Sequence, residues 1–96
     1  MKPLWKIRSG NFAGWRSDEE LLYNADGMNL GYFVGDIVYS SNGFYLGEIY
    51  KDDWIGRKVN ADYPARDAHV PHASITDVPQ AGRPGLTPED WDDPDF

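Results

Sequence analysis

Cysteine is absent from this chain, so neither a disulfide framework nor a thiolate metal site can hold its fold together. Long apolar runs are missing as well, and no segment has the length of a membrane-spanning helix. Residues 1–10 carry three basic residues without the apolar core of a signal peptide. The 96 residues are too few for two hydrophobic cores, so we expect one cytoplasmic unit without a membrane partner.

Basic residues are scarce and unevenly placed. Residues 1–59 hold seven lysines and arginines against eight acidic residues, whereas residues 60–96 hold two against eight. Binding to a phosphate backbone needs a basic surface, so we expect no nucleic-acid partner. Eleven of the fourteen aromatic residues lie in residues 1–59. We therefore expect residues 1–59 to form the core and residues 60–96 to be an acidic tail.

The first part of the chain contains an internal repeat of about sixteen residues. Its three copies begin at residues 9, 26 and 42 and read SGNFAGW, DGMNLGY and NGFYLGE. Each copy begins with a turn residue followed by glycine, which is a strong hairpin signal. The pairs Asp26-Gly27 and Asn42-Gly43 predict type I′ turns, whose two central residues both have positive φ.

Segments of strand length, rich in β-branched and aromatic residues, flank these turns. They are residues 21–23, 30–34, 37–39, 44–50 and 54–59. Gly35 and Asp36 predict a type II′ turn between the second and third of them, and only residues 17–20 could start a helical turn. The sequence thus predicts an all-β fold, a small antiparallel meander of repeated hairpins that is flower-like or barrel-like and pseudo-symmetric.

A second glycine of each repeat, at Gly14, Gly31 and Gly47, falls inside a predicted strand. Glycine weakens a strand and usually marks a place where another group comes close. We expect these glycines to let strands cross or bend near a shared centre, and a ligand against bare backbone is the alternative.

The repeats at residues 22–33 (LYNADGMNLGYF) and 37–47 (IVYSSNGFYLG) resemble the bacterial four-fold beta flower family. The resemblance covers about residues 4–59 and implies repeated hairpins around a pseudo-symmetry axis. It assigns no catalytic or binding residues. Glu48 stands where the other copies have Trp15 and Tyr32, and a fourth unit is visible only as the degenerate DDWIGR of residues 52–57. We expect these departures to mark a terminal cap of the repeat or, alternatively, a site.

Residues 60–96 contain six of the seven prolines, and their polar, acidic composition predicts a mostly irregular tail that packs little. An exception is the segment TPEDW, which has helix N-terminal signals and predicts one short helical turn at residues 87–92. We expect Trp91 and Phe96 to dock this turn onto the body, where it covers a sheet edge. The alternative is an acidic aromatic motif that is presented to another protein.

A carboxylate cluster beside Trp54 is the first candidate ligand site. It consists of Glu48, Asp52 and Asp53. Such a cluster could bind a hard cation or perform acid–base chemistry, and the alternative is a solvated hairpin end.

His69 and His72 are the second candidate, but two histidines would need a third metal ligand such as Asp67. We favour exposed tail residues over a metal site. No nucleophile elbow or glycine-rich oxyanion loop accompanies Ser40 or Ser41. The sequence therefore predicts no catalytic residue, no metal and no cofactor, and it favours a non-enzymatic role over an enzymatic one without deciding between them.

Strand alternation supplies the leading functional hypothesis. If Tyr32 and its alternate neighbours face the core, Phe33 faces solvent, and an aromatic surplus on so small a surface indicates an interface. We predict a protein-interaction or self-associating module whose partner is protein. Its predicted surface comprises Phe33, Phe44, Tyr45, Trp54, Trp91 and Phe96.

Two other functions stay open at this point. One is a small-ligand or metal-binding domain, with hydrolysis as a variant, that uses Glu48 with Asp52 or Asp53. The other is an acidic inhibitor or immunity-type protein that offers its tail to a basic partner.

Overall fold

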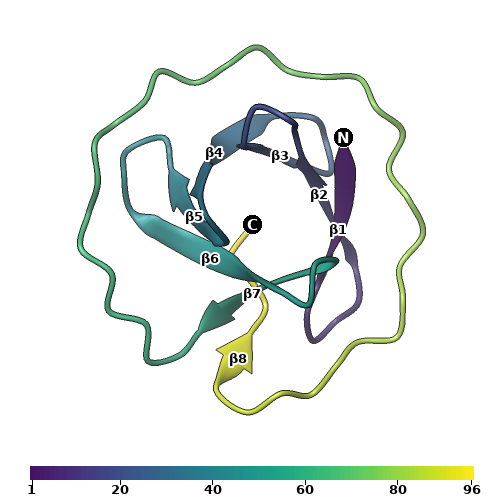
Figure 1. Ribbon diagram of the computed structural model, residues 1–96. Helices are drawn as coiled ribbons and strands as arrows, with labels where there is room; N and C mark the ends of the chain where they lie inside the picture. Colours follow the sequence, from purple (N-terminus) through teal and green to yellow (C-terminus); the bar gives the residue numbers. More distant parts are fainter.

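The structure, a computed structural model that describes residues 1–96, is a closed barrel inside an outer ring of irregular chain (Figure 1). Its strands are β1 Lys2–Lys6, β2 Phe12–Arg16, β3 Leu21–Asn24, β4 Asn29–Val34, β5 Ile37–Ser40, β6 Tyr45–Tyr50, β7 Trp54–Lys58 and β8 Trp91–Asp92. Each strand pairs antiparallel with the next, and β1 pairs parallel with β7, so that seven strands close the barrel. The predicted all-β meander of hairpins is confirmed.

Four antiparallel strand pairs, called petals 1 to 4 below, surround the barrel axis. Petals 1 to 3 are β1–β2, β3–β4 and β5–β6, and the strands of each follow one another directly in the chain. Petal 4 is β7–β8, in which Arg57 pairs with Asp92 and Lys58 pairs with Trp91. Its two strands are separated by residues 59–90, which run around the outside of the barrel before β8 returns (Figure 1).

The loop that follows β7 has the same hydrogen bond as its counterparts in other petals. The N–H of Ala61 donates to the carbonyl oxygen of Lys58 at 3.2 Å. In petal 2, the N–H of Gly27 donates to the carbonyl oxygen of Asn24 at 2.9 Å. The degenerate fourth repeat therefore does form a petal, and a segment from the far end of the sequence completes it.

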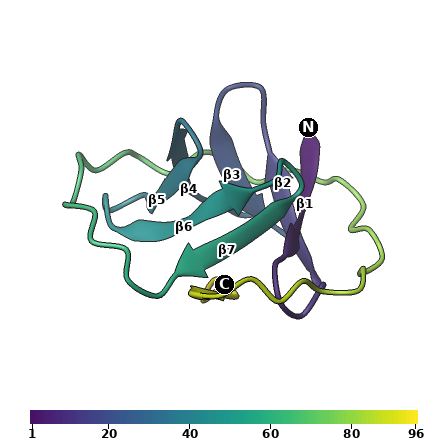
Figure 2. The ribbon, with the colours of Figure 1, turned by 60° about the horizontal axis from the view of Figure 1, so that its bottom comes forward.

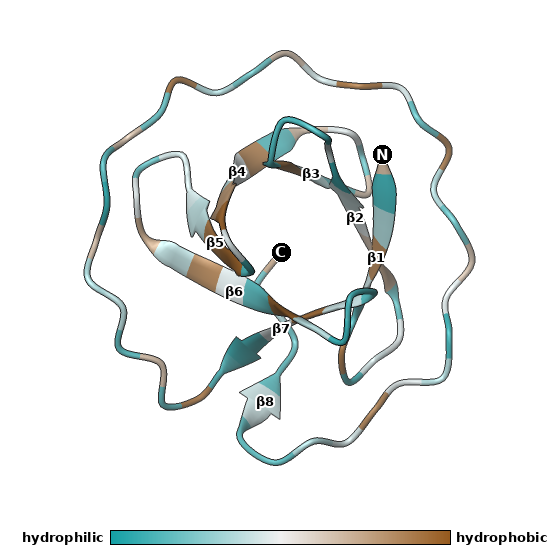
Figure 3. Cartoon of the chain, in the orientation of Figure 1, coloured by the Kyte–Doolittle hydropathy of each residue, from teal (hydrophilic) through white to brown (hydrophobic).

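One apolar side chain from each petal fills the barrel interior, and each of these four residues is 0% exposed: Leu4, Leu22, Val38 and Ile55. Ala13 and Phe33 belong to the same cluster, and Phe96 packs against it from the end of the tail. The C-terminus lies at the centre of the ring in Figure 1 and at one end of the barrel in Figure 2. Figure 3 shows brown, apolar stretches along the barrel strands, while most of the outer ring is teal or white.

The predicted outward orientation of Phe33 is wrong. Phe33 is 5% exposed and pairs with Val38 across β4 and β5, so both side chains lie on the inner face. Tyr32 instead lies on the outer face, in a second cluster with Trp15, Tyr23 and other aromatic residues that Ile75 and Tyr63 of the tail help to cover. A period of two separates the faces of a strand but does not say which is interior, and here both faces are covered.

The chain reverses at Gly27, Gly35 and Gly43, as predicted, but two of the turns differ in type. Gly27 and Gly43 have φ of 83° and 90°, whereas Asp26 and Asn42 do not have positive φ. The N–H of Asn24 donates to the carbonyl oxygen of Met28, and that of Ser40 to the carbonyl oxygen of Phe44. Each hydrogen-bonded loop therefore has three residues, the last a glycine in the left-handed region, and is not the two-residue type I′ turn. Gly35, with φ of 62°, begins a two-residue loop between Val34 and Ile37, which agrees with a type II′ turn.

The sequence predicts one short helical turn at residues 87–92 and leaves residues 17–20 as a place where another could start, and the structure has a helix at neither place. Residues 17–20 form the hairpin loop between β2 and β3, which Glu20 closes with a φ of 65°. Asp90 has the same φ, and Trp91 enters β8 because it pairs with β7. No part of the chain forms a helix that could span a membrane. The cytoplasmic location stays a prediction.

The in-strand glycines lie where neighbouring strands approach closely. A Cβ atom on Gly14 would lie 1.8 Å from the carbonyl oxygen of Tyr23, and one on Gly31 would lie 1.9 Å from that of Tyr39. Register shifts occur in the β1–β2, β3–β4 and β5–β6 ladders at equivalent positions. The prediction that these glycines allow close approach and bending is confirmed.

The tail is irregular, as predicted, but it does not pack loosely. Its backbone docks on the first glycine of each repeat, called a corner glycine below, at the tip of petals 1 to 3. The N–H groups of Arg66, Ile75 and Arg83 donate to the carbonyl oxygens of the corner glycines, each at 2.8 Å; these are Gly43, Gly27 and Gly10 in turn. The tail therefore passes the petals in reverse order, and backbone hydrogen bonds replace the apolar packing that its composition lacks.

Candidate functional site

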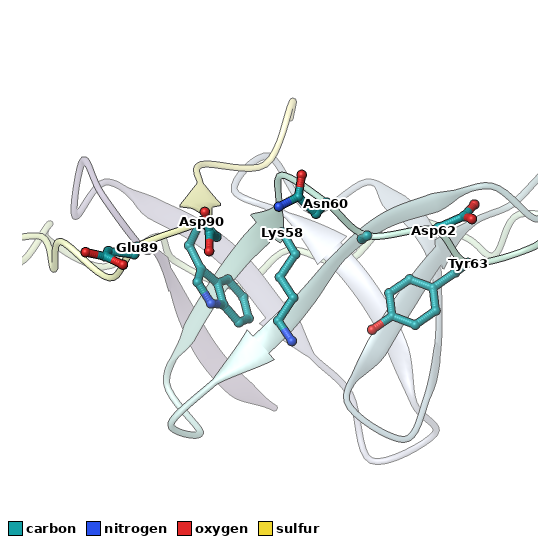
Figure 4. Close-up of a pocket in the computed structure, with 8 residues that line it drawn as sticks. Lys58, Asn60, Asp62, Tyr63, Glu89 and Asp90 are labelled. Atoms are coloured by element: carbon teal, nitrogen blue, oxygen red, sulfur yellow. The ribbon is translucent and has the colours of Figure 1, made fainter.

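A groove opens at petal 4, where the tail leaves the barrel and returns to it. Its volume is about 440 Å³, and it is lined by Lys58, Asn60, Ala61, Asp62, Tyr63, Glu89, Asp90 and Trp91. We call it the fourth-petal groove. In Figure 4 the side chain of Lys58 lies between the segment that carries Glu89 and Asp90 and the segment that carries Asp62 and Tyr63. Both walls of the groove therefore come from the tail, and β7 forms its floor.

The Trp91 ring borders the groove because β7 has no side chain at the position where the first strand of each other petal has an aromatic residue. In petals 1 to 3 the residue after the interior apolar side chain is aromatic, namely Trp5, Tyr23 or Tyr39. In petal 4 this residue is Gly56, and a Cβ atom there would lie 2.7 Å from Cε3 of Trp91. The indole of Trp91 therefore occupies the space of the missing side chain, with its edge against Tyr50 at a centroid distance of 5.2 Å.

Tail side chains cover the outer aromatic rings of the other petals. Arg83, whose N–H docks on petal 1, places its guanidinium carbon 3.4 Å from the ring centroid of Trp5. Arg66 docks on petal 3 in the same way, with its guanidinium carbon 5.2 Å from the centroid of Tyr39. Ile75, which docks on petal 2, packs against the aromatic cluster that contains Tyr23. At each of petals 1 to 3, one tail residue thus supplies both the backbone hydrogen bond and the cover.

Petal 4 has no such tail residue. The ammonium group of Lys58, from β7 itself, lies 5.4 Å from the ring centroid of Trp91. Ala61 stands at the loop position that glycine has in petals 2 and 3. A Cβ atom on the corner glycines would lie within about 2 Å of tail carbonyl oxygens, so the Cβ of Ala61 does not permit the same backbone approach. The fourth-petal groove is therefore suited to a side chain and not to a docked strand.

Acidic groups outnumber basic groups around the groove. Asp62, Glu89 and Asp90 are exposed and carry three carboxylates, against the single ammonium of Lys58. Such an arrangement attracts cations and disfavours anions. The groove lining therefore combines an aromatic ring with an excess of carboxylates over cations.

A buried hydrogen-bonded pair supports the groove from behind. The hydroxyl of Tyr45 donates to Oε1 of Glu48 at 3.0 Å and accepts from the backbone N–H of Lys58 at 3.0 Å. Burial raises the pKa of the Tyr45 hydroxyl, and the charge and hydrogen bond of Glu48 raise it further, against the lowering effect of the Lys58 N–H. Glu48 is 8% exposed, so it joins petal 3 to β7 and does not face a ligand.

Alkaline pH is expected to weaken the fold through Tyr45. The unfolded chain loses this proton near the ordinary pKa of about 10, whereas the folded chain retains it to higher pH. The contribution of Tyr45 is therefore complete below about pH 10, and the free energy of unfolding falls as the pH rises from there towards the folded pKa. Urea unfolding at about pH 9 and pH 11 should show a smaller loss in Tyr45→Phe than in the unchanged chain, and equal losses would contradict this assignment.

The predicted carboxylate cluster does not assemble. Asp52 forms an ion pair with Lys2 at 3.6 Å, and Asp53 pairs with Arg83 at 3.3 Å, while Glu48 is turned to Tyr45. No group of three or more histidine and carboxylate side chains could hold a metal ion.

The two tail histidines serve the docking of the tail. The ring of His69 stacks on Tyr32 at a centroid distance of 3.8 Å, and the hydroxyl of Tyr32 donates to the carbonyl oxygen of Asp67. The backbone N–H of His72 donates to Oδ1 of Asn29. The three residues considered as metal ligands therefore lie along one face of petal 2 without converging.

The aromatic residues predicted as an interaction surface have different surroundings. Phe44 is 62% exposed at the tip of petal 3, and Trp54 is half-buried in β7. Trp91 borders the groove, whereas Phe96 packs against the barrel interior, so both dock in cis as the sequence analysis favours. Tyr45 is held by its hydrogen bonds.

The sites predicted from the sequence did not include Lys58, Tyr63 or the acidic residues of the groove. One signal was available, because Ile55 in β7 is followed by glycine, whereas the interior apolar residue in the first strand of each other petal is followed by an aromatic residue. That missing ring could have indicated a pocket. It could not have named Trp91 as the residue that fills it.

Four antiparallel strand pairs around one axis, a shared apolar centre and a docked tail define a small structural all-β domain. The family model of the 4-fold beta flower protein matches residues 7–89, and the chain belongs to this family. No curated protein and no solved structure is similar enough to give a match.

Proposed function

We propose that this protein is a protein-interaction module that binds its partner through the fourth-petal groove. The observation that carries the proposal is the pattern of cover on the petals. Tail residues cover the outer aromatic rings of petals 1 to 3, and the Trp91 ring of petal 4 has no tail residue above it. A partner side chain in the groove would complete the pattern from outside.

The surroundings of the groove favour a polypeptide over a small substrate. The groove is open and its walls are irregular chain, whereas small-molecule sites bury most of their ligand. No convergent acid–base pair or metal-ligating group accompanies it. Phe44 offers a second exposed aromatic contact on the neighbouring petal 3.

Site-specific photo-crosslinking tests the proposal. A photoreactive amino acid at Asp62 should yield discrete adducts in expressing cells, because this position lines the groove. The matched control is Glu19, an exposed residue in the loop between β2 and β3, where no adduct is expected. A third placement at Phe44 shows whether petal 3 belongs to the same interface. Adducts of equal yield at Asp62 and Glu19, or none at Asp62, would contradict the proposal.

The acidic-inhibitor hypothesis becomes a variant of this proposal. Its partner would also be basic, and the exposed carboxylates of the tail add to the potential of the groove. Deleting residues 83–96 cannot test it without unfolding, because Trp91 and Phe96 belong to petal 4 and the barrel interior. Salt dependence distinguishes binding by the exposed carboxylates of the tail from binding in the aromatic groove. Affinity for the exposed carboxylates should fall steeply with salt, and affinity for the groove should fall less.

A further inference from the structure

The chain shows how its own arginine side chains are held. The guanidinium of Arg83 lies over the Trp5 ring at 3.4 Å and pairs with the carboxylate of Asp53 at 3.3 Å. The guanidinium of Arg16 lies over the Phe33 ring at 4.3 Å and pairs with Glu20 and Asp36. In both cases an aromatic face and at least one carboxylate hold the same group.

The fourth-petal groove contains both of these components. The ring of Trp91 replaces the outer aromatic residue of petal 4, and Asp62, Glu89 and Asp90 supply carboxylates. The guanidinium of Arg8, outside the lining, is already paired with Asp92 and donates to the carbonyl oxygens of Trp91 and Pro88. Lys58 is the only cation among the lining residues, and its ammonium lies 5.4 Å from the ring centroid. That distance is 2.0 Å greater than the distance from Arg83 to Trp5, so the ring face is not closely covered.

We infer that the fourth-petal groove binds an arginine side chain of the partner, whose guanidinium stacks near Trp91 and pairs with the carboxylates of the groove walls. This inference rests on the proposed function. A guanidinium is planar, stacks on aromatic faces and donates to carboxylates in two directions, whereas an ammonium is a more strongly hydrated point charge. The Lys58 ammonium competes with the arginine for the carboxylates and the ring, so removing its charge should strengthen arginine binding.

The three carboxylates decide the sign of the ligand charge. A phosphate or carboxylate ligand would meet three like charges and one ammonium group, which disfavours it. An uncharged side chain of the same shape would keep the stacking contact and lose the charge pairing. The comparison of a charged and an uncharged isostere therefore isolates the proposed recognition.

Titration with two blocked tripeptides tests this inference. The probes are acetyl-Gly-Arg-Gly-amide and the same peptide with citrulline, whose side chain has nearly the shape of arginine without its charge. Chemical shifts of the Trp91 indole N–H and of the backbone of residues 58–63 report binding. The arginine peptide should give saturable shifts confined to the groove, and the citrulline peptide should bind about tenfold more weakly or less.

Two variants sharpen the titration. Lys58→Met keeps an unbranched side chain that is one atom shorter and removes the competing charge, so the arginine peptide should bind it at least about threefold more tightly. Glu89→Gln should weaken binding, and Glu19→Gln, which changes an exposed carboxylate elsewhere, should leave it unchanged. Equal shifts with the arginine and citrulline peptides would overturn the inference. So would the absence of shifts with the arginine peptide in both the unchanged chain and Lys58→Met. Adducts at Asp62 together with such a result would retain the interaction module and reject only arginine as its ligand.

Discussion

Gly43→Ala is expected to release the tail from petal 3 and to lower the free energy of unfolding by about 2–4 kcal/mol. The added Cβ atom would lie 1.9 Å from the carbonyl oxygen of Arg66, so the tail backbone has to move away. Its movement breaks the hydrogen bond from the Arg66 N–H, and the alanine must also adopt a φ of 90°. Denaturant unfolding and amide exchange at Arg66 measure the two effects.

Gly35→Ala is the matched control for this experiment. Gly35 also has positive φ, at 62°, but nothing lies within 4 Å of the position of its Cβ. The free energy of unfolding of this variant should therefore fall only by the backbone strain, about 1–2 kcal/mol. The Arg66 amide should keep its protection from exchange. The difference between the variants isolates the docking of the tail. If Gly43→Ala and Gly35→Ala lose the same stability and the Arg66 amide stays protected in both, tail docking does not stabilise the fold.

Ending the chain at Asp90 is expected to open petal 4 and to remove most of the stability of the barrel. The truncation deletes β8, including the Trp91 ring that covers Gly56. It also deletes the Phe96 side chain, which packs against the barrel interior. Deleting one large buried aromatic side chain costs about 3–5 kcal/mol, and the two half-buried rings together should cost at least this much. Domains of this kind have only about 5–15 kcal/mol of stability, so the unfolded fraction should rise by orders of magnitude.

Phe96→Ala provides the comparison for the truncation. It removes the plug of the interior but leaves the pairing of β7 with β8 and the indole of Trp91 in place. Its loss of stability should therefore be smaller than that of the truncated chain, as measured by urea denaturation. Coincident unfolding curves for the truncated and unchanged chains would show that petal 4 does not support the barrel.

The repeated turn chemistry made the barrel predictable. Glycines at 27, 35 and 43 fix where the chain reverses, and the flanking strands then follow from residue type. The inner face was not predictable in the same way. Phe33 and Tyr32 do lie on opposite faces of β4, as predicted. Because the tail covers the outer face, both faces carry apolar side chains, and the apolar pattern could not show which face is interior.

The path of the tail was hidden for a different physical reason. Its hydrogen bonds to petals 1 to 3 are made by backbone N–H groups, which every residue type except proline can supply, so Arg66 and Arg83 dock at two petals and Ile75 at the third. Their spacing of nine and eight residues is visible only after the corner glycines have been located in space. The role of Trp91 depends on a strand pairing across more than thirty residues, which local patterns do not encode.

The divided petal also sets an order for folding. Petals 1 to 3 close loops of a few residues, whereas petal 4 must bring β7 and β8 together across residues 59–90. A loop about ten times longer adds about 2 kcal/mol of closure entropy, so we expect this joint to form last and to open first. The proposed partner would therefore bind where the fold opens most easily, at the β7–β8 pairing, and its binding would stabilise that pairing.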